Sequence, residues 1–325
     1  MSPTVRTIED LARLVEVSPS TISRVFNNDP RISTKTRKKV LDLAREHDFT
    51  PVQRKRSVSN RELRILLVTP SLNPQTPHIM DEAMMLFDGL SNAFTGARRI
   101  LEVMNSDELM ENMRGGRHIG DGVVSVFHKL GDIIREKLEK AGIPYIHLNR
   151  TIVPYVASND YKGFSMIAAH LAQRGYKKPA FVDFGLHPRS VERRAAYMSG
   201  MIQNFPDIQP YIVELPQPDM IDSALLRTCI NQDCDALMCF NDETALRAYA
   251  ACTEGGIRIP EDLAITGYDD VPAARLSTPR LTTVKLPIYH VSQLAGRWLR
   301  DVIRDRDTPP ISLEVTGELI VGGST

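Results

Sequence analysis

The sequence predicts a small all-α head followed by a larger α/β body of two doubly wound subdomains. Residues 1–49 show the apolar spacing and capping residues of three short helices. From residue 63 onward, short apolar runs alternate with amphipathic stretches of helical length. Residues 1–60 carry 12 Lys and Arg against 7 Asp and Glu, a net charge of +5, which the remaining chain balances with −5. A basic head on an acidic body is expected where one small domain meets nucleic acid, although a solvated basic surface would look the same.

Length and composition narrow the class of protein. A chain of 325 residues suggests two or three domains, and 42% hydrophobic with 25% charged residues excludes a disordered chain or a disulfide scaffold. Apolar runs stay well short of the roughly 20 residues that a membrane span needs, and the charged N-terminus lacks the apolar core of a secretory signal. Four cysteines, all within 229–252, suit free thiols in a reducing cytoplasm.

The first helix of the head is predicted to begin after Thr7, with Asp10 three residues on as in a capping box. The apolar pattern breaks at Glu16. Ser18 and Pro19 then start a second helix, because proline is accommodated at the first helical position. A short helix, a tight turn and a second helix form the helix-turn-helix arrangement, whose second helix can reach base edges in a major groove.

The second helix is expected to run to about Asn27 and to bury Ile22 and Val25, which leaves small polar residues and an arginine on its other faces. A third helix opens at Ser33 or Thr34 and carries several cations in its first turns. These cations oppose the helix dipole, and DNA phosphate would relieve that opposition. An ordinary three-helix bundle with no DNA role is the alternative.

Four patterns stand in order between residues 7 and 51: T-I-x-D-x-A, V-S-x-x-T-x-S-R-V-x-N, S-x-x-T-R-x-x-V and an aromatic-x-Pro. This long gapped sequence resembles the head of the lactose-repressor (LacI/GalR) family of bacterial transcription regulators. The resemblance implies base reading by Pro19, Ser20 and Arg24, and phosphate contacts from Thr21, Ser23 and Asn27. The family's turn usually holds glycine where this chain has Glu16, which predicts a changed turn backbone.

The basic linker at 50–62 has no apolar period and should be disordered on its own. The resemblance implies a hinge helix on DNA, in which Arg56 matches the family pattern and Val58 stands where a leucine enters the minor groove. A shorter, β-branched side chain should unstack bases less effectively. The predicted DNA-contacting residues are Thr7, Ser18, Pro19, Ser20, Thr21, Ser23, Arg24, Asn27, Arg37, Arg56 and Val58.

Buried parallel strands are expected in the body, because such strands appear in sequence as short apolar runs. The runs are Ile65–Val68, Gly122–Val126, Pro144–Leu148, Ala180–Phe184, Ile212–Leu215, Ala236–Phe240 and Ala264–Gly267. Helical stretches between them predict doubly wound sheets, and the segment is too long for one sheet of usual size. Two similar α/β subdomains follow from this pattern alone.

Further landmarks of the same family follow in order at 120–124, 142–144, 241–243, 259–263, 267–270 and 279–284. They imply a periplasmic-binding-protein-like core with three crossovers between its lobes. The domain prediction is a helix-turn-helix DNA-binding domain at 1–49, a hinge at 50–62, and an effector-binding and dimerisation core at 63–325. Lobe 1 is placed at about 63–150 and 286–306, and lobe 2 at about 151–285 and 307–325. The crossover helix between 101 and 121 is expected to be truncated, and a homodimer is expected because no C-terminal heptad repeat follows.

The space between the lobes is the predicted effector site, since ligands of open α/β sheets bind beyond the carboxyl ends of strands. The family match implies that the effector contacts are Asn73, Asn149, Arg193, Asn241 and Asp269. Amides, carboxylates and a guanidinium suit a sugar or a small polar anion. Asp242 is expected to cap the following helix, and a helix cap or a salt-bridged loop residue is the alternative for each of the others.

Motifs for catalysis, cofactors and metals are not found in the sequence. Cys229-x4-Cys234-x4-Cys239 does not fit common zinc spacings, and neither a Walker loop nor a nucleophile elbow appears. The sequence predicts a cytoplasmic, ligand-responsive, sequence-specific regulator, a repressor of carbohydrate or small-metabolite genes. It would bind a pseudo-palindromic double-stranded DNA operator as a homodimer, without a cofactor or a membrane. A small-molecule binding protein with weak or lost DNA specificity, and an α/β enzyme on the same fold, are the alternatives.

Overall fold

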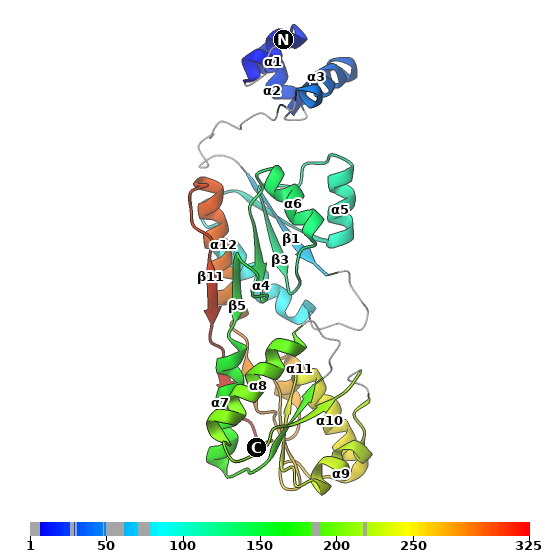
Figure 1. The fold of residues 1–325 in the computed structure, drawn as a ribbon, viewed down its shortest axis with the longest axis vertical. Coiled ribbons are helices and arrows are strands. Elements are labelled where there is room, and N and C mark those ends of the chain that lie inside the picture. The colour runs from blue at the N-terminus through cyan, green and yellow to red at the C-terminus, as the bar shows by residue number, and fades with distance from the viewer. Residues whose placement is uncertain are drawn as a thin grey trace. The chain divides into compact units, whose positions relative to one another are not determined.

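The computed structural model describes residues 7–26, 29, 31–47, 49, 62–70, 79–183, 189–216 and 220–325. The chain forms two compact units, residues 1–58 and 59–325 (Figure 1). Four predicted site residues, Asn27, Arg56, Val58 and Asn73, lie outside the described residues. Among the helices described, none is long and apolar enough to cross a membrane.

The head contains the three helices α1 (Ile8–Val15), α2 (Pro19–Phe26) and α3 (Thr34–Glu46). Their predicted starts are confirmed. Thr7 and Asp10 form a capping box on α1, the Ser18 hydroxyl accepts from the Thr21 amide, and Ser33 caps α3. The three helices bury a common core of Leu11, Ala12, Val15, Ile22, Val25, Val40 and Ala44.

Glu16 forms the turn between α1 and α2 in the left-handed conformation, with φ 63° and ψ 44°. Its backbone N–H bonds to the carbonyls of Ala12 and Arg13, and the Val17 N–H bonds to Ala12 at 3.0 Å. A left-handed residue is where glycine is favoured, and a side chain there costs about 1–2 kcal/mol. The prediction of a changed turn backbone was therefore wrong: the turn keeps its glycine-type geometry and Glu16 bears the strain.

The first lobe is a six-stranded parallel sheet in the order β11-β5-β4-β3-β1-β2. Its strands are β1 (Leu63–Thr69), β2 (Arg99–Asn105), β3 (Gly122–Val126), β4 (Tyr145–Leu148), β5 (Tyr155–Ser158) and β11 (Ser312–Val315). On one face α4 (Ile79–Ala93) packs with α12 (Ile288–Arg304), and Gly122 leaves room for Leu299 of α12. On the other face α5 (Ser106–Arg114) and α6 (Asp132–Lys140) bury Leu109 and Ile134 against the sheet (Figure 1).

The observed sheet extends beyond the predicted lobe boundaries. Strands β5 and β11 pair within the first sheet, so this lobe continues past residue 150 and again past residue 306. Strand β2 was missed because Arg99 and Glu102 interrupt its apolar run, as is common at a sheet edge. The crossover between 101 and 121 does hold a helix, the nine-residue α5.

The second lobe is a four-stranded parallel sheet in the order β7-β6-β8-β9. Its strands are β6 (Pro179–Asp183), β7 (Tyr211–Glu214), β8 (Ala236–Cys239) and β9 (Ala264–Thr266). Helices α7 (Asp160–Arg174) and α8 (Ser190–Asn204) pack together, with Phe164 and Tyr197 both against Phe181 of β6. Helices α9 (Ser223–Asn231) and α10 (Asp242–Gly255) join the apolar cluster on the opposite face, and α11 (Pro272–Leu276) follows β9.

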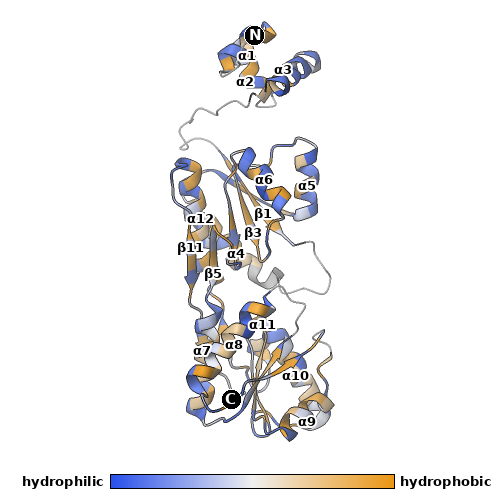
Figure 2. Ribbon diagram, in the orientation of Figure 1, coloured by the Kyte–Doolittle hydropathy of each residue, from blue (hydrophilic) through white to orange (hydrophobic). Residues whose placement is uncertain are grey.

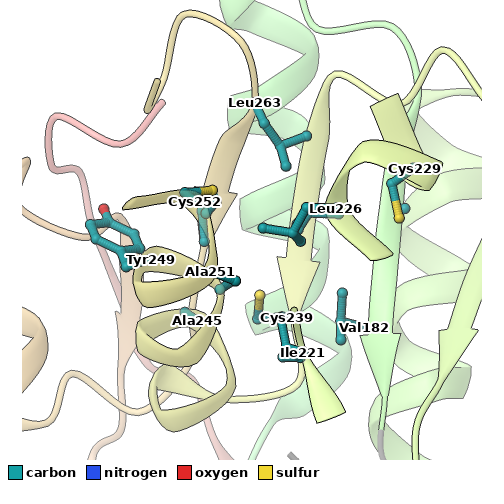
Figure 3. Close-up of a cluster of buried hydrophobic side chains, with 14 of the residues drawn as sticks. Val182, Ile221, Leu226, Cys229, Cys239, Ala245, Tyr249, Ala251, Cys252 and Leu263 are labelled. Atoms are coloured by element: carbon teal, nitrogen blue, oxygen red, sulfur yellow. The ribbon is translucent and has the colours of Figure 1, made fainter. Parts of the chain in front are cut away.

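Free cysteines lie inside that opposite-face cluster (Figure 3). Cys229, Cys239 and Cys252 pack among aliphatic side chains such as Leu226 and Val182. Burial raises the pKa of Cys229 and of Cys252 to about 11, which keeps both as thiols at neutral pH. These cysteines therefore serve as small apolar core residues.

Three connections join the two lobes, as predicted. The chain passes from β5 into α7, from β10 (Thr283–Lys285) into α12, and from β11 into β12 (Glu318–Ile320). Strands β10 and β12 pair antiparallel as a separate two-stranded sheet. Figure 2 shows hydrophobic residues concentrated on strands such as β1, β3 and β5, with hydrophilic residues on the covering helices.

Candidate functional site

Helix α2 presents an exposed polar face. Ser18, Pro19, Ser20 and Arg24 are exposed, whereas Thr21 and Ser23 are half-buried. Ser20 and Arg24 lie four residues apart and so share one side of the helix. The buried Ile22 and Val25 hold the opposite side on the head's core. The residues predicted to read bases thus stand on the accessible side of a firmly packed helix.

Hydroxyl groups at the start of α2 bond to one another. The Ser18 hydroxyl lies 2.8 Å from the Ser20 hydroxyl and 2.9 Å from that of Thr21. Each of these groups can both donate and accept. A phosphate or base acceptor can therefore replace one of these bonds without leaving the helix cap unpaired. Thr7, in contrast, is engaged in the capping box of α1.

Arg37, one of the predicted DNA contacts, braces the head internally. Its guanidinium donates to the Val25 carbonyl at 3.3 Å and to the Asp29 carbonyl at 2.6 Å, which ties α3 to the end of α2. Lys39 similarly donates to the Val15 carbonyl at 3.1 Å. The Arg31 guanidinium pairs with the Asp29 carboxylate and holds the pKa of that carboxyl well below its usual range.

Arg193 is the centre of the predicted effector site. Its guanidinium donates to the Phe240 carbonyl at 2.6 Å and to Asp269 at 2.8 Å, and its Nε lies 3.5 Å from Asp160. It also lies over the rings of Phe240 and Tyr268, 4.6 and 4.5 Å from their centroids. Burial disfavours the charged guanidinium, but Asp269 and Asp160 outweigh it and raise the pKa of Arg193.

Asp269 completes this pair after strand β9, in a backbone conformation with φ 123°. Burial raises the pKa of the Asp269 carboxyl, against the opposing effect of the Arg193 guanidinium. Such positive φ values are uncommon for a residue with a side chain. This position places the Asp269 carboxylate 2.8 Å from an arginine of a different strand–helix unit, a pairing that the sequence did not predict.

The amide of Asn241 caps α10, accepting from the Thr244 backbone N–H at 2.9 Å and from its hydroxyl at 2.7 Å. The prediction that Asp242 caps this helix was therefore wrong. Asp242 is instead fully buried and accepts from the Val271 amide and the Thr283 hydroxyl. Burial raises the pKa of Asp242 to about 7. It links α10 to the segments that follow β9 and form β10.

Asn149 directly follows strand β4 and is buried, with φ 54°. Its amide oxygen accepts from the Ser158 backbone N–H at 2.8 Å. Its backbone carbonyl accepts from Arg189 at 3.2 Å, and the same guanidinium reaches Asp160 at 2.5 Å. The structure therefore joins Asn149 to Arg193 through Arg189 and Asp160.

Sequence reasoning missed the roles of Arg189 and Asp160. Asp160 directly follows Asn159, which caps α7, and no local pattern marks its carboxylate as a buried partner of distant arginines. Arg189 lies four residues before Arg193, and that spacing at a helix start was the available signal. Together the group offers guanidinium donors and carboxylate acceptors at the carboxyl ends of β4, β8 and β9. This chemistry suits the hydroxyls of a small polar ligand.

Comparisons with known proteins agree with this architecture. The family model for bacterial regulatory proteins of the lacI family matches residues 7–52, and the model for a periplasmic-binding-protein-like domain matches residues 168–325. The probable HTH-type transcriptional repressor ExuR of Bacillus subtilis (strain 168) is 28% identical over 331 residues, covering 98% of each chain.

Solved structures share the fold over the full length. A transcriptional regulator CelR–cellobiose complex is 24% identical with a TM-score of 0.68 and covers 99% of this chain and 100% of its own. A lac repressor dimer bound to operator and the anti-inducer ONPF is 22% identical with a TM-score of 0.66 and covers 98% and 99%. The predicted combination of a helix-turn-helix head and a periplasmic-binding-protein-like core is thereby confirmed.

Proposed function

This chain belongs to the lacI family of bacterial regulatory proteins, and we propose that it is a ligand-responsive repressor that binds a pseudo-palindromic operator as a homodimer. The observation that carries this proposal is the accessible face of α2. Ser20 and Arg24 are exposed there, on a capped helix whose other side is buried. Small hydroxyls and a guanidinium at such positions match the donors and acceptors of base edges in a major groove.

The ligand proposed for the body is a sugar or another small polar metabolite. The Arg193–Asp269 pair and its neighbours supply paired donors and acceptors, which fit adjacent hydroxyl groups. The relative solved with cellobiose supports the same ligand class. A ligand alters DNA binding only if it binds the DNA-competent and DNA-incompetent arrangements unequally.

The family consists of transcription regulators, and a regulatory rather than an enzymatic role is proposed for this chain. A cytoplasmic location is part of the proposal, because that is where operator DNA lies and where free thiols such as the four cysteines persist.

Selection of genomic fragments by the full-length protein tests this function. At about 150 mM salt, which suppresses non-specific binding, the protein should recover a short inverted repeat. Arg24→Ala should strongly reduce that enrichment. Arg45→Ala, which removes an exposed arginine paired with Asp42 on α3, is the matched control and should retain it.

The same selection is repeated with a pool of sugars. A sugar that changes recovery identifies the ligand and shows whether it releases or promotes DNA binding. Recovery of no motif in any condition would overturn the proposed regulator. It would favour a small-molecule binding protein whose head no longer reads sequence.

A further inference from the structure

The start of α8, from its N-cap residue Arg189 into its first turn, contacts the opposite lobe through one side of the helix. Arg189, Glu192 and Arg193 are spaced i, i+3 and i+4, and they therefore project from the same side. Arg189 donates to the Asn149 carbonyl, and Glu192 lies 3.9 Å from Arg150. Asn149 and Arg150 belong to the β4–β5 connection of the first lobe, whereas α8 belongs to the second.

The Arg189 contact is buried and bridges two acceptors. Only 11% of its side chain is exposed, and Asp160 is 4% exposed. The planar guanidinium reaches the Asp160 carboxylate with one terminal nitrogen and the Asn149 carbonyl with the other. A lysine ammonium lacks this rigid fork, so the bridge is particular to arginine. The same Asp160 carboxylate lies 3.5 Å from Arg193.

We propose that Arg189 is a positioning residue of the effector site. With the Glu192–Arg150 pair, it clasps α8 to the β4–β5 connection and holds Asn149 in register with Arg193 and Asp269 before a ligand enters. This inference rests on the proposed function in one respect: Asn149, Arg193 and Asp269 are the candidate ligand contacts of that function. The clasp itself is a property of the free body and is tested without DNA or ligand.

Hydrogen–deuterium exchange and small-angle X-ray scattering of the full-length protein test the clasp. Arg189→Ala should speed amide exchange in residues 149–158 by on the order of tenfold or more, since a buried charge loses its partner. It should also enlarge the radius of gyration. Arg189→Lys should behave similarly, because it keeps the charge but cannot span both acceptors.

Arg194→Ala is the matched control. Arg194 is the next residue along α8 after Arg193, but its partners Asp183 and Glu214 both lie in the second lobe. Its loss should speed exchange around β6 and β7 and leave residues 149–158 and the radius of gyration unchanged. Identical exchange patterns for Arg189→Ala and Arg194→Ala would overturn the clasp and leave Arg189 a general stabiliser of the second lobe.

Charge reversal at the partly buried Arg150–Glu192 pair provides a second test that is independent of Arg189. Arg150→Glu and Glu192→Arg should each speed exchange in 149–158, and the double variant should restore it toward the wild-type rate. If the double variant did not restore the wild-type exchange rate, the Glu192–Arg150 pair would not be part of the clasp. If Arg189→Ala also left 149–158 unchanged, the proposal would fail. An operator selection that succeeded would still leave the proposed function intact.

Discussion

The two candidate sites are built on helices whose first turns are organised in opposite ways. At the start of α2, the Ser18 hydroxyl bonds to the hydroxyls of Ser20 and Thr21 within three residues of chain, and Ser18 and Ser20 are exposed to solvent. At the start of α8, Arg193 is buried and its partners Phe240 and Asp269 stand 47 and 76 residues away. The contacts at the start of α2 join neighbours in the chain at the surface, whereas those at the start of α8 join residues that only the folded lobe brings together.

This difference predicts where substitutions act. A change on the exposed face of α2 removes a contact with an external partner and should leave folding almost unaffected. Substitution of a residue in the buried group around Arg193 leaves its oppositely charged partner unpaired inside the second lobe. Such a change should therefore lower the free energy of unfolding as well as ligand binding.

The largest effect is expected for Arg193→Met. It leaves the Asp269 carboxylate and the Phe240 carbonyl without their guanidinium donor, and the free energy of unfolding should fall by about 3–5 kcal/mol. Urea unfolding of the full chain measures this loss. Arg247→Met is the control, because its i, i+4 pair with Glu243 is partly exposed and should contribute below about 1 kcal/mol. Equal losses would contradict the contrast between buried and accessible pairs.

Asp242→Asn should change the pH dependence of stability. Because the pKa of Asp242 is about 7 in the native state and 3.8 ordinarily, the native state binds the extra proton between these values. The free energy of unfolding of the wild type should therefore fall as pH rises from about 4 to 7, by up to about 4 kcal/mol relative to Asp242→Asn. Urea titrations at several pH values measure the difference.

Asp262→Asn is the control for that titration. The exposed Asp262 carboxylate bonds to Arg258, which lowers its pKa to about 2. Its contribution is lost only as pH falls from about 4 toward 2, outside the window in which Asp242 titrates. A wild-type curve parallel to that of Asp242→Asn between pH 4 and 7 would contradict the raised pKa of Asp242.

The same contrast explains how much the sequence could predict. Thr7, Ser18 and Ser33 were assigned to helix starts because a cap depends on neighbours in the chain. Arg193 and Asp269 were predicted as separate ligand contacts from the family pattern, but the sequence held no sign that they pair with each other. Arg189 was missed because its partners come from another lobe and another helix.

Dependence on distant partners also explains a missed strand and a misassigned helix cap. Strand β5 was missed because its run Tyr155–Ser158 contains a single β-branched residue, Val156, and its pairing with β4 and β11 is what fixes it as a strand. Asn241 and Asp242 are both good capping residues, and only the position of Thr283 on the crossover strand decides which one turns inward. In each case, local propensity left two choices and a distant partner selected one.

Arg24→Ala tests the accessible face of α2, where a substitution should affect DNA binding and not folding. We expect a loss of about 1–3 kcal/mol in binding to the selected operator, and a smaller loss on random DNA, because a base-edge contact is specific. Thermal unfolding should be unchanged, since Arg24 is exposed. Equal losses on operator and random DNA would assign Arg24 to phosphate contact alone.

The smallest effect is expected at Glu16, where strain lies in an exposed turn of the head. Glu16→Gly should stabilise the head by about 1 kcal/mol, because glycine adopts φ 63° without a side-chain penalty. Slower amide exchange in α1 and α2 would report it. Glu16→Ala removes the same carboxylate but keeps the Cβ atom, and so should give no such gain. Stabilisation by both variants would mean that the charge of Glu16, rather than its backbone conformation, limits the stability of the turn.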